Sequence, residues 1–142
     1  MREILFRGKD RTGKWRESST VFIRGELALM LTEKPIKELV KDKKGELVDV
    51  IFNFCTLDKE TVGQFTGLTD KNGKKIFEGD IIQGVITSRW NKSLIRCEIV
   101  YKGDCFLAIE KISNTLWEHK IRFAKDIEVI GNIHDNPELL ED

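Results

Sequence analysis

The chain has 142 residues, of which 40% are hydrophobic and 34% are charged, and this composition excludes a disordered protein. Because 24 basic side chains balance 24 acidic ones, net charge gives no reason to expect a nucleic-acid or membrane partner. No apolar run approaches the roughly 20 residues that a membrane-spanning helix needs, so we expect a soluble protein without a membrane partner.

The beginning of the chain shows a hairpin pattern. Residues 3–8 predict a strand, a polar turn containing Gly13 follows, and a second strand begins near Trp15. Residues 21–23 are expected to extend this second strand. The apolar run over residues 26–31 is too short for periodicity to decide between a buried strand and a helical turn.

A short helix is expected next. Thr32 can cap it, and Pro35 is tolerated in a first helical turn. Ile36, Leu39 and Val40 then follow at the i, i+3, i+4 spacing that forms one apolar stripe. The predicted helix packs on a sheet and ends at the lysine pair and glycine that follow it.

The clearest strand signal comes after this helix. Val48, Val50, Phe52 and Phe54 occupy alternate positions, which places four large apolar side chains on one face of a strand. We therefore expect a strand over these residues.

From residue 62 onward the sequence predicts strands joined by glycine turns. Asn72 and Gly73 are residue types that accept positive φ in a tight hairpin turn. A second hairpin is expected from the alternating residues 95–101, a turn at Gly103 and a strand over residues 105–109.

The end of the chain completes the predicted core. Residues 127–131 predict a last strand, and Asn136 followed by Pro137 predicts the start of a terminal helical turn. Hydrophobic spacing and glycine corners predict that seven large side chains lie in one core, namely Phe65, Leu68, Ile76, Phe77, Ile81, Val129 and Ile133.

These elements together predict a mainly β protein, an α+β fold with little helix. We expect a compact antiparallel sheet, barrel-like or sandwich-like, with one short helix and a C-terminal helical turn. Residues 1–142 are expected to form a single domain, with an N-terminal region over 1–60 and a β core over 61–142 as an alternative subdivision.

Three segments resemble a known family. They are residues 3–9 (EILFRGK) with Gly13 to Trp15 after them, residues 61–82 (TVGQFTGLTDKNGKKIFEGDII) and residues 128–140 (EVIGNIHDNPELL). This pattern is similar to that of the YopX-like proteins of phages and prophages and covers essentially the whole chain. The resemblance implies a predominantly β fold encoded by a phage or prophage, and it implies no activity that transfers residue by residue.

No catalytic, metal or cofactor site is expected. The three cysteines are odd in number and widely spaced, which indicates a reducing compartment and hence the cytoplasm. Cys97 lies in an alternating strand, where a cysteine behaves as a small buried hydrophobe. No known motif brings a cysteine and a histidine together for catalysis. A zinc site would have to use Cys97, Cys105, His119 and His134, whose separations are long and irregular and lack the close-paired spacing of a structural site.

Two stretches combine cations with an indole and are candidates for nucleic-acid binding. The first comprises Arg89, Trp90, Lys92 and Arg96, because Arg and Lys neutralise phosphates and an exposed indole stacks on a base. The alternative is that Trp90 packs back onto the core. The second and weaker candidate is Lys14 with Trp15.

The leading hypothesis is a phage or prophage accessory protein, a non-catalytic β domain that binds a macromolecule. Single-stranded nucleic acid is placed slightly ahead of a phage or host protein as the partner. An oligomeric protein-interaction or structural module and an enzyme of unrecognised type are the alternatives. Short strands leave unpaired edges, and basic and acidic residues gather in different parts of the chain, so we also expect a homo-oligomer.

Overall fold

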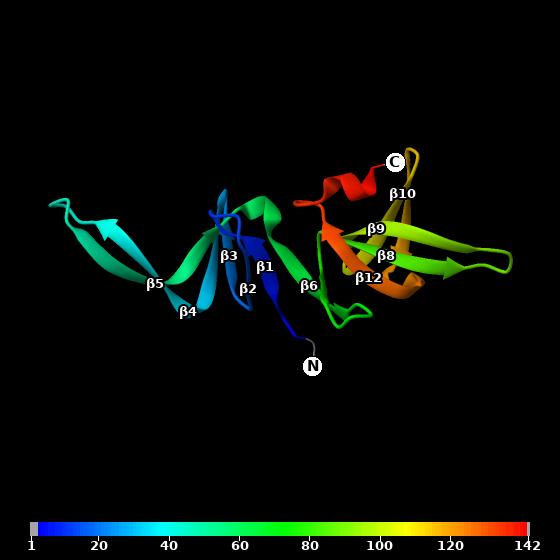
Figure 1. Ribbon diagram of the computed structural model, residues 1–142, viewed down its shortest axis with the longest axis horizontal. Coiled ribbons are helices and arrows are strands. Elements are labelled where there is room, and N and C mark those ends of the chain that lie inside the picture. The colour runs from blue at the N-terminus through cyan, green and yellow to red at the C-terminus, as the bar shows by residue number, and fades with distance from the viewer. Residues whose placement is uncertain (1–2, 142) are drawn as a thin grey trace. The chain divides into compact units, whose positions relative to one another are not determined.

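A computed structural model describes residues 3–141 (Figure 1). The chain separates into two compact units. One unit consists of residues 4–62, and the other consists of residues 63–141 together with Glu3. No helix in residues 3–141 is both long and apolar enough to cross a bilayer.

The unit of residues 4–62 is built from antiparallel strands, three short and two long. Its elements are β1 (Phe6–Lys9), β2 (Trp15–Ser18), β3 (Val21–Arg24), β4 (Leu27–Lys41), β5 (Leu47–Leu57) and the 3-10 turn η1 (Lys59–Thr61). β1 and β2 form the predicted N-terminal hairpin, in which Lys9 lies opposite Trp15. β3, β4 and β5 form a three-stranded sheet in that order, so the ambiguous run after residue 25 is a strand.

The helix predicted to begin at Thr32 and end at Lys43-Lys44-Gly45 is wrong, because residues 32–41 belong to the 15-residue strand β4. Ile36 lies opposite Phe52, and Val40 lies opposite Val48. Pairs between β-branched and aromatic residues across antiparallel strands are favourable, and here they outweigh a helical stripe of only three side chains. Pro35 falls in the register irregularity between Leu31 and Ile36, where a strand tolerates a missing N–H.

The core of this unit lies at the inner end of β4 and β5. Ala28, Met30 and Leu57 are buried there, and Val21, Cys55 and Val62 pack against them. Leu57 also explains Gly8, because a Cβ at position 8 would lie only 2.8 Å from the Leu57 Cδ1 atom.

The outer parts of β4 and β5 form a two-stranded ribbon, which we call the β4–β5 arm (residues 32–56; Figure 1). β3 pairs only with Leu27 to Met30, so it does not reach the arm. The predicted strand over residues 48–54 is confirmed, and its apolar face is not covered, because Val48 and Phe54 are exposed. The alternating apolar side chains of the arm therefore lie on a ribbon of only two strands, and their face stays exposed to solvent.

The unit of residues 63–141 contains a five-stranded antiparallel sheet in the order β11-β10-β9-β8-β12. Its elements are β6 (Gly63–Thr69), β7 (Lys75–Phe77), β8 (Asp80–Thr87), β9 (Lys92–Lys102), β10 (Cys105–Ile112), β11 (Thr115–Lys120), η2 (Ile121–Phe123), β12 (Lys125–Asn132) and η3 (Pro137–Leu140). The structure confirms both predicted hairpins, the last strand and the terminal helical turn.

The larger core lies between this sheet and the β6–β7 hairpin. Ile76 from β7 is buried against Ile82, Cys97, Ile99, Ala108, Ile121 and Val129. Of the seven residues predicted to share one core, Ile76 and Val129 lie in this cluster and Leu68 packs against it. Phe65, Phe77 and Ile81 are buried but are not part of this cluster, and Ile133 is half-buried, so the single predicted core is confirmed only in part. The mainly β class is confirmed, and because the sheets do not close into a barrel, the sandwich-like form of the prediction is the one that fits.

Three turns share one sequence pattern, Asp-x-x-Gly followed by Lys or Glu. In the third, the Asp70 Oδ1 atom accepts hydrogen bonds from the N–H groups of Asn72 and Lys74, both at 2.9 Å. Gly73 has a φ of 80°, whereas Asn72 does not have positive φ, so the prediction holds only for the glycine. The turns that begin at Asp10 and Asp42 repeat the same side-chain bonds. In each turn the aspartate side chain accepts hydrogen bonds from backbone N–H groups that have no strand partner there.

Candidate nucleic-acid interface

The β8–β9 hairpin ends in a four-residue turn, from Ser88 to Asn91. The Ser88 N–H donates to the Asn91 carbonyl at 2.8 Å, and the Asn91 N–H donates to the Ser88 Oγ atom at 3.1 Å. The backbone of the turn is therefore satisfied by its own ends. This closure places Arg89 and Trp90 at the apex.

The hairpin extends beyond the other strands of its sheet (Figure 1). On one side, β12 pairs with β8 only as far as Val85. On the other side, β10 pairs with β9 only as far as Cys97. The residues between these limits form a two-stranded projection, and we call its end, residues 87–94, the hairpin tip.

The hairpin tip exposes an aromatic ring together with two cations. Trp90 is 88% exposed, and Arg89 and Lys92 are also exposed. The Arg89 Cζ atom lies 5.7 Å from the centroid of the Trp90 ring, so the guanidinium and the indole are neighbours. A nucleotide offers complementary groups, because its base can stack on the indole and its phosphate can meet the cations.

Arg96 lies further along β9, at the foot of the projection. It faces Gln83 across the hairpin and is about 13 Å from Lys92 by strand rise. Its Nε atom donates to Gln83 Oε1 at 3.3 Å, and its Nη1 atom donates to the Leu139 carbonyl at 3.4 Å. The structure thus brings Arg89, Trp90 and Lys92 together and gives Arg96 contacts within the protein.

Leu94 is a residue of the hairpin tip that the sequence reasoning missed. It lies between Lys92 and Arg96, opposite Val85, and it is exposed. The sequence contained a signal for this residue. Side chains alternate between the two faces of a strand, and Leu94 is three positions from the buried Cys97, so it points to the opposite face of β9.

Trp15 and Lys14 belong to the other unit. Trp15 is half-buried, with the Arg7 Cζ atom 4.7 Å and the Lys9 Nζ atom 5.4 Å from its ring centroid. Cations of the same chain therefore already occupy the indole. Lys14 is exposed, and its backbone belongs to the turn that begins at Asp10.

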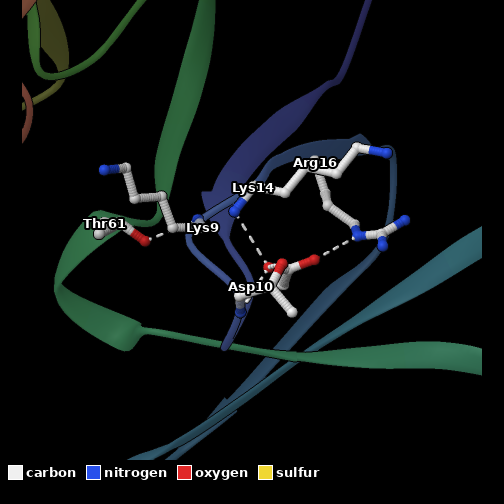
Figure 2. Close-up of polar contacts among 6 residues, drawn as sticks. Lys9, Asp10, Lys14, Arg16 and Thr61 are labelled. Carbon is white, nitrogen blue, oxygen red and sulfur yellow. Dashed lines mark hydrogen bonds and ion pairs between the residues drawn. The ribbon is translucent and has the colours of Figure 1, made fainter.

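Asp10 organises this basic stretch (Figure 2). Its buried carboxylate accepts hydrogen bonds from the backbone N–H of Lys14 at 3.1 Å and from the Arg16 Nε atom at 2.8 Å. Burial alone would raise the pKa of Asp10, but the hydrogen bonds from Thr12, Arg16 and two backbone amides outweigh it and hold the pKa well below its ordinary value. Beside it, the Lys9 N–H donates to the Thr61 Oγ1 atom at 2.8 Å.

Cys97 is in a poor environment for a nucleophile. Burial first, and the Glu110 carboxylate second, raise the pKa of the Cys97 thiol to about 12, so the thiol is protonated at neutral pH. The nearby His119 Nε2 atom lies 3.5 Å from the Glu110 Oε2 atom. Within residues 3–141, no group of three or more His, Cys, Asp or Glu side chains is arranged to hold a metal ion.

Comparison with known proteins supplies the family. The family model described as YopX protein matches residues 6–141. The chain belongs to the YopX family. A solved structure similar to this chain is that of protein EF1440 from Enterococcus faecalis, which is 28% identical, with 99% of this chain and 100% of that chain covered and a TM-score of 0.59. No curated protein is significantly similar to this YopX-family chain.

Proposed function

We propose that this YopX-family chain is a non-catalytic phage or prophage accessory protein that binds single-stranded nucleic acid through the hairpin tip. The observation that supports it is the exposure of Trp90, which is 88%, beside the exposed Arg89 and Lys92. An indole held in water at the apex of a projection leaves a ring face on which a base can stack. The phage or prophage setting rests on the YopX family.

Single strands suit this tip better than a duplex. Paired bases already stack on one another, whereas the bases of a single strand can stack on an exposed indole. The turn residues Ser88 and Asn91 satisfy each other, so the tip offers cations and a ring without a set of groups that would read base edges. Binding is therefore expected to depend weakly on sequence.

The cytoplasm is the proposed location. Cys105 is an exposed free cysteine, and Cys55 is free and half-buried. A reducing compartment keeps such thiols from being oxidised, which supports this location.

Fluorescence anisotropy with labelled oligo-dT and oligo-U tests the proposal. Trp90→Ala should weaken binding by roughly 5- to 150-fold, because stacking on one base is worth roughly 1 to 3 kcal/mol. Trp90→Phe should have a milder effect. Trp117→Ala is the matched control, because Trp117 is an exposed indole of the same unit that lies on β11, and it should leave binding unchanged.

Salt dependence tests the two cations separately from the ring. Changing both Arg89 and Lys92 to Ala removes two phosphate contacts and should lower the logarithmic salt slope by about 1.4. The control pair, Lys111→Ala with Lys120→Ala, removes the same charge from exposed positions outside the tip and should leave the slope unchanged. Absence of binding to either oligonucleotide at about 50 mM salt would refute the proposal, because electrostatic binding is strong there.

A further inference from the structure

β5 is an open edge strand in the part of the chain that the structure describes. In the sheet order β3-β4-β5 it is the last strand, with β4 on one side only. Its other side meets a single isolated bridge, between Leu57 and Asp10, at its inner end. Residues 47–56 therefore present a row of backbone N–H and C=O groups to which another strand can pair.

The two strands of the β4–β5 arm differ in how their edges are protected. The free stretch of β4 carries Pro35 and three lysines, which are the residue types that prevent edge-to-edge pairing. The β5 edge carries neither proline nor lysine. Its one charge is Asp49, whose carboxylate is 3.1 Å from the Lys37 Nζ atom of the same arm. β5 is thus the edge left open.

The arm also exposes apolar side chains on both faces. Leu47 and Ile51 are each 65% exposed, and Phe54 on the other face is 43% exposed. An isolated two-stranded ribbon is marginally stable in water, and three or more strands are needed for an apolar face to be covered. A further strand beside β5 would pair with its free backbone N–H and C=O groups. It would also shield these apolar side chains from water.

We propose that a second copy of this chain supplies that strand, and that two β5 edges pair antiparallel about a two-fold axis at Ile51. The result is a four-stranded sheet in the order β4-β5-β5-β4, with each copy contributing the same surface. This inference is independent of the nucleic-acid proposal, because the β4–β5 arm and the hairpin tip share no residue.

The charge pattern of β5 favours a second copy in this register. With Ile51 opposite itself, Val50 lies opposite Phe52, and Asp49 lies opposite Asn53, so the only charge meets an amide that can donate to it. Val48 meets Phe54, and pairs of β-branched and aromatic residues are favourable across strands. Moving the axis to Val50 or Phe52 also keeps like faces together, but it places Asp49 against an apolar or thiol side chain.

Cysteine cross-linking tests the register. In a background with Cys55→Ala and Cys105→Ala, Ile51→Cys places two thiols at the axis, where opposed Cα atoms lie about 4.5 to 5.5 Å apart, within the range of a disulfide. Diamide, which accepts the two electrons and two protons, should convert most of this variant to a covalent dimer. Leu39→Cys is the matched control, because Leu39 is 67% exposed on β4, away from the axis, and should remain monomeric on non-reducing gels.

Mass in solution tests the dimer itself. The unmodified chain should sediment with twice the chain mass, whereas Ile51→Lys, which sets two ammonium groups against each other, should sediment as a monomer. Leu39→Lys introduces the same charge at a similarly exposed position and should stay dimeric. Circular dichroism shows that each variant is folded before its mass is compared.

Three results would overturn the inference. The first is a monomeric unmodified chain at up to about 100 μM, where even a weak dimer would be populated, and this would assign the β5 edge to a strand of a different protein. The second is an equal effect of the two lysine substitutions. The third is equal cross-linking by Ile51→Cys and Leu39→Cys.

Discussion

β9 and β5 are both eleven-residue strands with alternating apolar side chains, yet the middle of β9 is buried whereas the outer part of β5 is not. In β9, Cys97 and Ile99 are fully buried between the five-stranded sheet and the β6–β7 hairpin. In β5, Val48 and Phe54 are exposed. β9 pairs with β8 and β10, whereas the outer part of β5 pairs only with β4. Alternation thus determines the strand and its faces, and neighbours distant in sequence determine which face is buried.

The largest expected effect comes from shortening one isoleucine in each strand. Ile99→Ala creates a cavity in the larger core and should lower the free energy of unfolding by about 2 to 5 kcal/mol. Ile51→Ala removes the same atoms from a 65% exposed position and should cost less than about 1 kcal/mol. Urea denaturation at a fixed, low protein concentration measures both. Equal losses would mean that the two strands are covered to the same extent.

A second comparison uses two turns with the same Asp-x-x-Gly pattern, one with a buried aspartate and one with an exposed aspartate. Besides its turn bonds, the buried Asp70 carboxylate accepts a hydrogen bond from the Val129 N–H of β12 at 3.0 Å. Asp42 closes the exposed end of the β4–β5 arm with turn bonds alone. Asp70→Ala leaves buried donors unpaired and should cost about 3 kcal/mol, whereas Asp42→Ala should cost under about 1 kcal/mol. Thermal unfolding of the two variants gives the difference, and a larger loss from Asp42→Ala would contradict it.

The smallest effect concerns acid. Burial raises and hydrogen bonds lower the pKa of Asp10, with the hydrogen bonds prevailing, so its contribution to stability is complete above the unfolded pKa of about 3.9 and is lost as the pH falls below it. Burial raises the pKa of Glu98, so its contribution has the opposite sign and is lost as the pH rises through the range above its ordinary value. Between about pH 5 and pH 2, Asp10→Asn should therefore flatten the fall in stability, and Glu98→Gln should steepen it.

Urea midpoints measured across that range test the signs. Asp10→Asn keeps the size of the side chain and Glu98→Gln does the same, so each serves as a control for the other. Slopes that move in the same direction in the two variants would contradict the assignment.

Local patterns predicted the fold wherever the controlling contacts are close in sequence. The hairpins around Gly73 and Gly103 depend on turn chemistry within a few residues, and both are present. The helix expected from Ile36, Leu39 and Val40 failed because the competing partners, such as Phe52, lie on the strand that follows and are invisible to a local window. A short apolar stripe cannot distinguish these outcomes.

The residues of the candidate interface were predictable from the sequence, but their exposure to solvent was not. The sequence placed Arg89, Trp90 and Lys92 in one polar loop between strands, and in the structure all three lie at the hairpin tip. It could not show whether Trp90 faces water, because that depends on where β10 and β12 stop along the hairpin. Arg96 was grouped with them by distance in sequence, and its contact with Leu139 from the end of the chain was not foreseeable.

The bond between Asp70 and Val129 also has a consequence for the order of folding. The β6–β7 turn closes over a few residues, so it can form on the microsecond timescale of an isolated hairpin. The pairing of β12 with β8 joins segments far apart in the chain and carries a larger loop-closure entropy, so we expect it to form later. The Asp70 Oδ1 atom is engaged by the early turn, which holds the Oδ2 atom in place to receive the Val129 N–H when β12 arrives. We therefore expect the β6–β7 turn to form before β12 pairs and to hold the Asp70 carboxylate in the position that accepts the Val129 N–H. Substitutions in this turn should slow folding more than they speed unfolding.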